Sequence, residues 1–193
     1  MSDLKAELIE YFKKNNSFKH DPVNKFRLSS GMESEFYVDC KALMADPIAL
    51  DKVAQYAFEK IKNIQFDCIG GLEIGAIAIA TVISGFGMRT AAQTWPTFVV
   101  RKQVKGHGLG KKIEGITNKH ALIVDDVLTS GGSILQAVDA ARHEGLKVTH
   151  ALVIVDRQEQ EGRKNLESKG VELISLLAIK DFQTFKKLAP VFS

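Results

Sequence analysis

Apolar residues follow a regular rhythm through most of this chain. From residue 66 onward, short aliphatic runs are separated by longer stretches in which apolar residues recur at helical spacing. The runs predict strands at 68–71, 97–100, 121–124, 148–155 and 171–177. Strands that alternate with helices form a mainly parallel, doubly wound sheet with helices on both faces, so the chain is predicted to have an α/β fold.

Several helix boundaries are marked by their local chemistry. Asp46-Pro47 predicts the start of one helix, with Asp as N-cap and Pro at the first helical position. Ser2 is the expected N-cap of the first helix, which fades at Asn15-Asn16. Further helices are expected over residues 75–84, 133–144 and 181–188, the first ending near Gly85 and Gly87 and the second closed by Gly145.

The first 45 residues do not follow the strand–helix alternation. Residues 26–28 and 36–38 have strand-like composition, and residues 29–34 look like the turn between them. We therefore expect residues 1–45 to form an N-terminal helix and a small hood over the carboxyl edge of the sheet. Residues 46–193 are expected to form the core, and the two parts to make one structural domain.

Residues 121–133 carry the most informative pattern. Four apolar residues, typical of a strand buried on both faces, lead into Asp125 and Asp126 and then into a loop of small residues before the next helix. Glycines let the backbone approach a ligand, and the hydroxyls of Thr129, Ser130 and Ser133 lie beside free helix N–H groups, an arrangement suited to a phosphate. The carboxylates can accept hydrogen bonds from vicinal hydroxyls, so the pattern predicts a ribose 5-phosphate site.

Simpler interpretations compete with each candidate site. The acidic pair could be solvated, with a polar turn and N-cap after it. The stretch is neither a Walker A loop nor Gly-x-Gly-x-x-Gly. Residues 101–112 hold five basic residues, His107 and three glycines, and could form either a solvated loop or a cationic lid over a departing anion. Arg157, after the strand at 148–155, could pair with an anionic substrate, or with Asp156 or Glu159.

Composition narrows the class of protein. An apolar fraction of 45% supports a core and excludes a disordered chain. The net charge of +3 comes without an arginine-rich stripe interleaved with aromatic residues, so no nucleic-acid partner is expected. Cys40 and Cys68 form neither a metal-binding motif nor a disulfide framework. No signal peptide or membrane-spanning run is visible, and we expect a soluble cytoplasmic protein.

Residues 121–133 resemble the phosphoribosyl-pyrophosphate signature of the type I phosphoribosyltransferases. Arg-Lys-x-x-Lys-x-His-Gly at 101–108 and the hood segment 28–39 resemble the orotate branch of that family, and the resemblance covers nearly the whole chain. It implies transfer of the phosphoribosyl group from 5-phosphoribosyl 1-pyrophosphate (PRPP) to orotate, giving orotidine 5′-monophosphate and pyrophosphate in pyrimidine synthesis. It also implies a homodimer in which the basic loop reaches the partner's site.

The resemblance assigns roles to particular residues. It implies catalytic roles for Lys105, His107, Asp125 and Asp126. PRPP is expected to contact these four and Arg101, Lys102, Val127, Leu128, Thr129, Ser130, Gly131, Gly132 and Ser133. Orotate is expected to contact Tyr37, Val38, Thr129 and Arg157, and the backbone of Glu73, Ile74 and Gly75 is expected to face the pyrophosphate. Mg²⁺ is implied as cofactor, carried mainly by the substrate, with Asp125 as a candidate ligand.

Three positions depart from the family pattern. Gln103 stands where many members have Glu, and Ser29 and Ile74 stand where some members have Lys. A lysine contact to the base and a side-chain contact to pyrophosphate are therefore not implied here. Two other functions remain open: a phosphoribosyltransferase for another base, and a non-enzymatic regulator that senses a nucleotide. The hood and Arg157 argue against the first, and the basic loop argues against the second.

Overall fold

A six-stranded sheet organises the computed structural model, which describes residues 3–27, 33–103 and 112–183. The strand order is β10-β9-β8-β5-β6-β7, and all neighbours are parallel except β6 and β7, which are antiparallel. Its strands are β5 (Cys68–Leu72), β6 (Thr97–Val100), β7 (Ile113–Gly115), β8 (His120–Leu128), β9 (Lys147–Asp156) and β10 (Glu172–Ala178). The predicted α/β fold with a mainly parallel, doubly wound sheet is confirmed.

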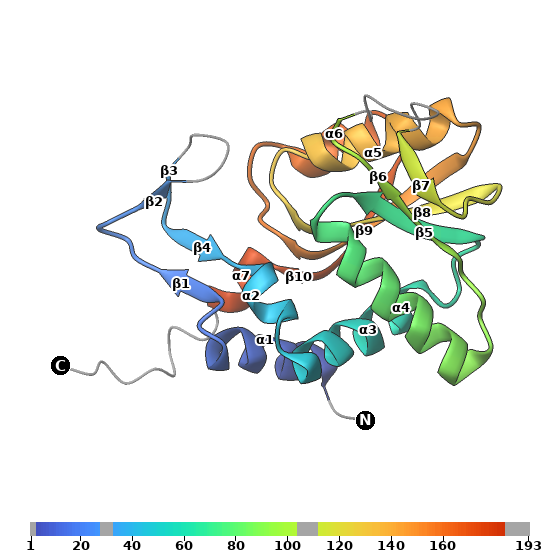
Figure 1. Cartoon of the computed structure of the whole chain (residues 1–193). Helices are drawn as coiled ribbons and strands as arrows, with labels where there is room; N and C mark the ends of the chain where they lie inside the picture. The colour runs from blue at the N-terminus through green and yellow to red at the C-terminus, as the bar shows by residue number, and fades with distance from the viewer. Residues whose placement is uncertain (1–2, 28–32, 104–111, 184–193) are drawn as a thin grey trace.

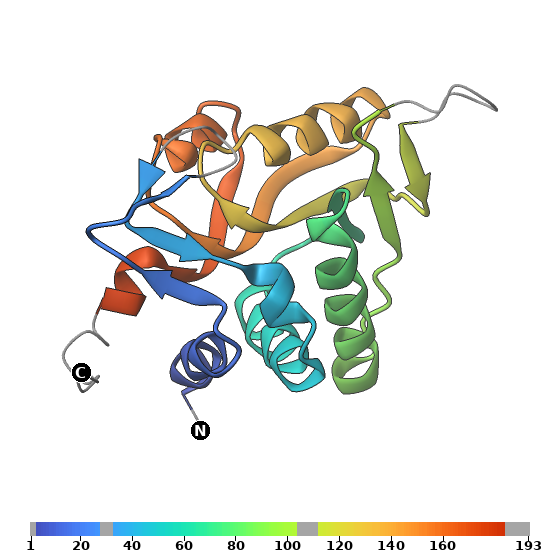
Figure 2. The same cartoon turned by 60° about the vertical axis from the view of Figure 1, so that its left-hand side comes forward.

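Helices cover both faces of this sheet, as Figures 1 and 2 show. One face packs against α1 (Leu4–Lys14), α3 (Pro47–Ile61) and α4 (Gly75–Ala91), and the other against α5 (Gly132–His143) and α6 (Gly162–Glu167). The short helix α7 (Ile179–Gln183) follows β10. Because β8 contributes Leu122 and Val124 to one core and Ala121 and Ile123 to the other, its apolar run is buried on both sides.

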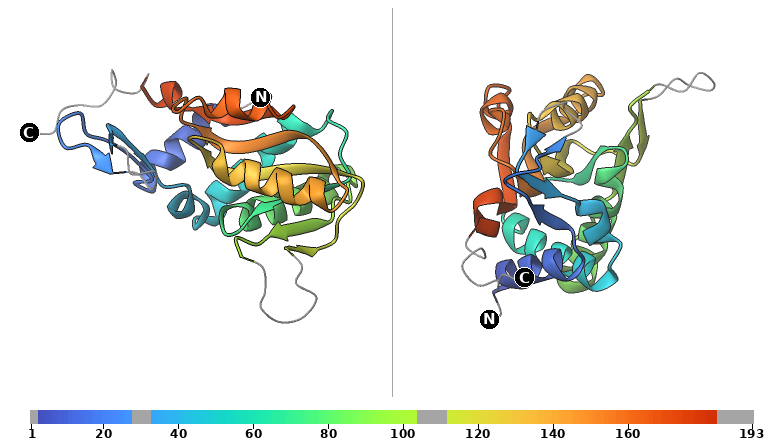
Figure 3. Two further views of the ribbon diagram at one scale, coloured as in Figure 1. Left: turned by 90° about the horizontal axis from the view of Figure 1, so that it is seen from above. Right: turned by 90° about the vertical axis from the view of Figure 1, so that its left-hand side faces the viewer.

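The hood consists of two small antiparallel ribbons at one end of the sheet (Figures 1 and 3). Strand β1 (Phe18–His20) pairs with β4 (Phe36–Val38), and β2 (Phe26–Arg27) pairs with β3 (Glu33–Ser34). Helix α2 (Cys40–Met44) follows the hood and leads into α3. The hood lies beside the carboxyl ends of the sheet strands, since Arg157 after β9 bonds to Ser34 and Phe36 in it.

One predicted helix boundary is confirmed, and two others are wrong. Asp46 caps α3 by accepting hydrogen bonds from the amides of Ile48 and Ala49, with Pro47 in the first turn, as predicted. The cap of α1 is Asp3 rather than Ser2, because the Asp3 carboxylate accepts from the Lys5 and Ala6 amides. Helix α4 runs beyond Gly85 and Gly87 to Ala91. Gly87 is there for packing, since a Cβ at this position would lie 2.7 Å from the Trp95 ring.

Four short elements were not predicted: β1, α2, β7 and α6. The predicted turn over residues 29–34 is also partly wrong, since Glu33 and Ser34 form strand β3. The predicted hairpin between residues 26–28 and 36–38 is not formed, because β2 pairs with β3 and β4 pairs with β1. Within the described residues, no helix is long and apolar enough to cross a membrane.

Candidate active site at the carboxyl edge of the sheet

The acidic pair lies where β8 separates from β5. These two strands pair from Cys68–Ala121 only as far as Gly70–Ile123, whereas β8 continues beside β9 to Leu128. Asp125 and Asp126 therefore belong to the last part of the strand, not to the loop after it. Because β6 and β8 lie on opposite sides of β5, this is the switch point of the sheet, the place where open α/β sheets bind ligands.

The start of α4 approaches both carboxylates. A Cβ on Gly75 would lie 2.9 Å from Asp125 Oδ1 and 3.0 Å from Asp126 Oδ1, so only glycine lets the helix begin this close. Ile74, the residue before the helix, provides no side-chain cap and is 73% exposed. The structure thus brings the predicted pyrophosphate segment, Glu73 to Gly75, against the acidic pair and leaves helix N–H groups available beside it.

The loop after β8 has the backbone shape that a phosphate site requires. Gly131 has φ +86°, a left-handed conformation that glycine adopts without strain, and it caps α5 without a side-chain hydrogen bond. Asn165 of α6 donates to the Ser130 carbonyl oxygen at 2.9 Å and supports the loop from behind. The first amides of α5 can therefore bind an anion, alongside the exposed Ser130 and Ser133.

Burial and like charge act on Asp125. This residue is 7% exposed, and desolvation together with the neighbouring charge of Asp126 raises the pKa of its carboxyl group from 3.8 to about 7. Its Oδ1 accepts the Asp126 amide at 2.9 Å, and Asp126 Oδ1 accepts the Val127 amide at 3.0 Å. Asp126 also forms an ion pair with Lys41 of α2, at 3.0 Å from Oδ2. The hydrogen bond to Asp126 raises the pKa of Lys41.

The raised pKa of Asp125 predicts how stability depends on pH. Between pH 3.8 and about 7 the folded protein holds a proton that the unfolded chain has released, so the free energy of unfolding falls as pH rises through this window. Asp125→Asn removes the titrating group, so this variant should lose less stability than the wild type as the pH rises. The melting temperature of the variant relative to that of the wild type should therefore be roughly 5 °C higher at pH 8 than at pH 4. Thermal unfolding without ligand or Mg²⁺ measures this; parallel pH profiles would contradict it.

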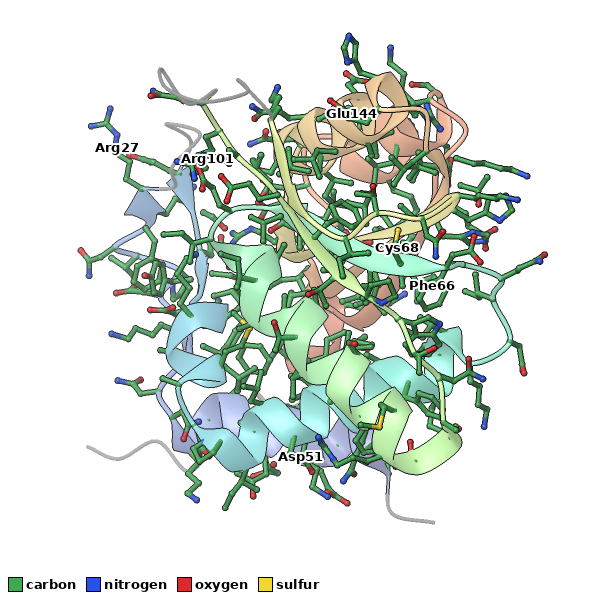
Figure 4. The ribbon with its side chains drawn as sticks, turned by 45° about the vertical axis from the view of Figure 1, so that its right-hand side comes forward. Arg27, Asp51, Phe66, Cys68, Arg101 and Glu144 are labelled. Carbon is green, nitrogen blue, oxygen red and sulfur yellow. The ribbon has the colours of Figure 1, made fainter. Side chains whose placement is uncertain are left out.

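The first residues of the basic loop, residues 101–112, contact the pyrophosphate segment and β7. The Lys102 amide donates to Glu73 Oε1 at 2.9 Å, and Arg101 pairs with Glu114 of β7 at 3.1 Å. Figure 4 shows Arg101 on the hood side of the sheet, with Phe66 and Cys68 at the opposite end. Lys105 and His107 lie outside the described residues, so their roles stay predictions.

Arg157 joins the core to the hood. Its guanidinium is buried, with the side chain 4% exposed, and Nε donates to Glu159 Oε2 at 3.0 Å. Its Nη2 donates to Ser34 Oγ at 2.8 Å and to the Phe36 carbonyl oxygen at 3.0 Å. The alternative of an ion pair with Glu159 is thus realised, although in a buried setting, and Asp156 pairs with Arg163 instead. Contact of Arg157 with a substrate stays a prediction.

The Arg157 network predicts the effect of a conservative substitution. Arg157→Lys keeps the charge but cannot bond Glu159, Ser34 and Phe36 together, because an ammonium group lacks the planar fork. We expect a loss of about 2 kcal/mol and a fall in melting temperature of roughly 5 °C. Arg89→Lys, at an exposed position in α4, is the control and should change neither. An unchanged melting temperature in Arg157→Lys would show that the network does not hold the hood.

Of the other predicted base-contacting residues, Thr129 directly follows β8, and Tyr37 and Val38 lie on β4. Tyr37 is 37% exposed, with its ring 5.7 Å from that of Phe26 in β2, and Val38 pairs with Phe18 of β1. Sequence reasoning missed Lys41 and Ser34, which contact Asp126 and Arg157. No local signal could have found Lys41, because its bond to Asp126 spans 85 residues.

The donor set near the acidic pair fits a cation that brings most of its own ligands. Among the described residues, no group of three or more His, Cys, Asp or Glu side chains could hold a metal. Asp125 and Asp126 offer carboxylate oxygens, which Mg²⁺ prefers, but one Asp126 oxygen already pairs with Lys41. Such a site suits Mg²⁺ bound chiefly through phosphate and hydroxyl oxygens of a substrate.

Comparisons with known proteins agree with this geometry. The phosphoribosyl transferase domain family matches residues 39–187. The orotate phosphoribosyltransferase of Leptospira biflexa is 38% identical, over 94% of this chain and 100% of its own length. That of Methanosphaera stadtmanae is 37% identical, over 96% and 99%. The crystal structure of the Mycobacterium tuberculosis orotate phosphoribosyltransferase in complex with PRPP has a TM-score of 0.74, with 28% identity over 93% of this chain and 99% of that one.

Proposed function

This chain belongs to the orotate phosphoribosyltransferase family, and from that premise we propose how its site performs phosphoribosyl transfer from PRPP to orotate. The products are orotidine 5′-monophosphate and pyrophosphate, and the reaction is a step of pyrimidine biosynthesis. The observation that carries the proposal is the joining of three parts at one switch point: the acidic pair of β8, the glycine-rich loop before α5 and the Gly75 start of α4.

The acidic pair has the chemistry to hold the ribose. Asp125 and Asp126 accept hydrogen bonds from the two ribose hydroxyls, while the amides and hydroxyls of residues 129–133 bind the 5′-phosphate. As the bond from ribose C1 to pyrophosphate breaks, positive charge develops on the sugar. Fixed carboxylates beside the ring stabilise that charge more strongly in the transition state than in the bound substrate.

The remaining parts place the base and the leaving group. Thr129, Arg157 and the β4 backbone at Tyr37 and Val38 surround the orotate, with Glu159 fixing the guanidinium. The Ile74 and Gly75 amides face the pyrophosphate, whereas the Glu73 amide already donates to the Val100 carbonyl oxygen at 2.9 Å. Arg101, Lys102, Lys105 and His107 balance the charge of the pyrophosphate. Asp125 is the candidate protein ligand for Mg²⁺, which, when bound with the substrate, would supply further neutralisation of the pyrophosphate. In this proposal residues 1–45 supply the N-terminal helix and the hood, and residues 46–193 form the phosphoribosyltransferase core. The proposed location of the enzyme is the cytoplasm.

We further propose a homodimer with shared active sites. An exposed apolar stripe along α4 supports it. The stripe consists of Ile74, which directly precedes the helix, and of Ile77 and Met88 on one face of it, and these side chains are 73%, 41% and 59% exposed. The stripe begins at the pyrophosphate segment, so a partner packed there lies next to the active site. In such a dimer the basic loop of one subunit supplies Lys105 and His107 to the other.

A panel of bases tests the proposed function. Purified protein, PRPP and Mg²⁺ are incubated with orotate, uracil, adenine or hypoxanthine, and pyrophosphate release is followed by a coupled assay. We expect release with orotate and at most background release with the other bases. Preference for a purine would show that the hood selects a base other than orotate.

A further inference from the structure

Helix α2 contacts the acidic pair through two consecutive residues. Lys41 Nζ lies 3.0 Å from Asp126 Oδ2, and the Cys40 thiol, which is buried, donates to the Asp126 carbonyl oxygen at 3.7 Å. The helix is set in place by Asp39, whose carboxylate accepts the Ala42 amide at its start. A short element next to the hood therefore reaches directly to the end of β8.

The contact fixes the orientation of one catalytic carboxylate. Asp126 Oδ1 accepts the Val127 amide and Oδ2 accepts Lys41, so both oxygens are held and the carboxylate cannot rotate freely. Each carboxylate oxygen has two acceptor positions, which leaves one on each oxygen for a hydroxyl donor. The Lys41 cation also offsets the repulsion between the adjacent charges of Asp125 and Asp126.

A purely structural role accounts poorly for this ion pair. The Lys41 side chain is 68% exposed, and pairs with such exposed partners contribute little to folding stability. Asp126, in contrast, is only 15% exposed and belongs to the site. The arrangement matters more for the geometry of the carboxylate than for the fold.

We propose that Lys41 is a positioning residue of the ribose site, which orients Asp126 toward the hydroxyls of PRPP. The inference rests on the proposed function, because the hydroxyls concerned are those of the phosphoribosyl donor. Lys41 acts through Asp126 and does not itself touch the substrate. Its effect should therefore fall on PRPP and not on orotate.

Steady-state kinetics separates this role from a structural one. Lys41→Met should raise the KM for PRPP roughly tenfold, since a misplaced group costs binding, and should leave the KM for orotate within about twofold. Loosening of the hood would raise the KM for orotate as well, because Lys41 lies just after β4. Lys41→Arg should restore most of the PRPP affinity. Lys62→Met, which breaks an ion pair with Glu59 on α3, is the matched control.

A double-mutant cycle tests whether Lys41 acts through Asp126. PRPP binding with Mg²⁺ is measured by calorimetry for Lys41→Met, Asp126→Asn and the double variant, with circular dichroism confirming the fold. We expect Lys41→Met to cost nothing further once Asp126 is Asn. Additive losses would overturn the positioning role and make Lys41 a direct ligand.

The possible failures are distinguishable. A wild-type protein that neither binds PRPP nor consumes orotate would overturn the proposed function and this inference with it. A wild-type protein with normal turnover, together with an unchanged KM for PRPP in Lys41→Met, would overturn the inference alone. A parallel rise in both KM values would reduce Lys41 to a support of the hood.

Discussion

Changing both Asp125 and Asp126 to Asn lowers turnover by roughly 10²-fold or more, because neutral amides cannot stabilise the positive charge that develops on the ribose. The fold should remain intact, since Asn has nearly the shape of Asp and the double variant removes two like charges from a sheltered site. The measurement is kcat for orotidine 5′-monophosphate formation, with circular dichroism as the check on folding.

A matched control separates this effect from a general loss of charge. Asp139→Asn removes a carboxylate from the exposed side of α5 and should leave kcat unchanged. Near-normal turnover in the folded double variant would remove the acidic pair from the chemistry and leave the ribose without its proposed partner.

Mixing two inactive homodimers restores activity if the active sites are shared. One carries Lys105→Ala, and the other carries Asp125→Asn with Asp126→Asn. In the mixed dimer, one site combines the intact acidic pair with the intact Lys105 of its partner, and the other site collects both defects. Activity should therefore rise toward half of the wild-type value per mixed dimer.

Subunit exchange must be shown in the same experiment. Native mass spectrometry of differently labelled subunits measures the fraction of mixed dimers, and mixing each variant with itself is the control. A loop that serves its own subunit leaves one defect in every site, so exchange without recovered activity would falsify the shared-site proposal. Lys105 lies outside the described residues. The mixing experiment therefore tests whether this residue serves the active site of the partner subunit, which the structure of a single subunit does not.

The central part of the fold could be predicted from the sequence because its signals are local. An aliphatic run, two acids and a glycine-containing loop are enough to place strand, acidic pair and helix in order, and β8 and α5 confirm that order. Asp46-Pro47 likewise marks the start of α3, because capping involves only neighbouring residues. The mainly parallel sheet then follows from the alternation of strands and helices.

Other features depend on distant partners and leave no local signal. Strand β1 has three residues and exists because β4 lies beside it, and α2 has five residues. Gly87 looked like a helix end, yet it lies inside α4 because Trp95 packs against it. The ion pair of Arg157 with Glu159 was foreseeable, because the two residues are neighbours in the sequence. The burial of Arg157 beneath Ser34 and Phe36 was not, because its hydrogen bonds to the hood span more than a hundred residues.

A crystal structure with PRPP and Mg²⁺ tests the central claim most directly. The account predicts both ribose hydroxyls within hydrogen-bonding distance of the Asp125 and Asp126 carboxylates, with the 5′-phosphate on residues 129–133 and the pyrophosphate beside Gly75. Lys41 should still hold Asp126 in that complex. PRPP bound with its ribose away from the acidic pair, or its 5′-phosphate away from the loop before α5, would contradict the account.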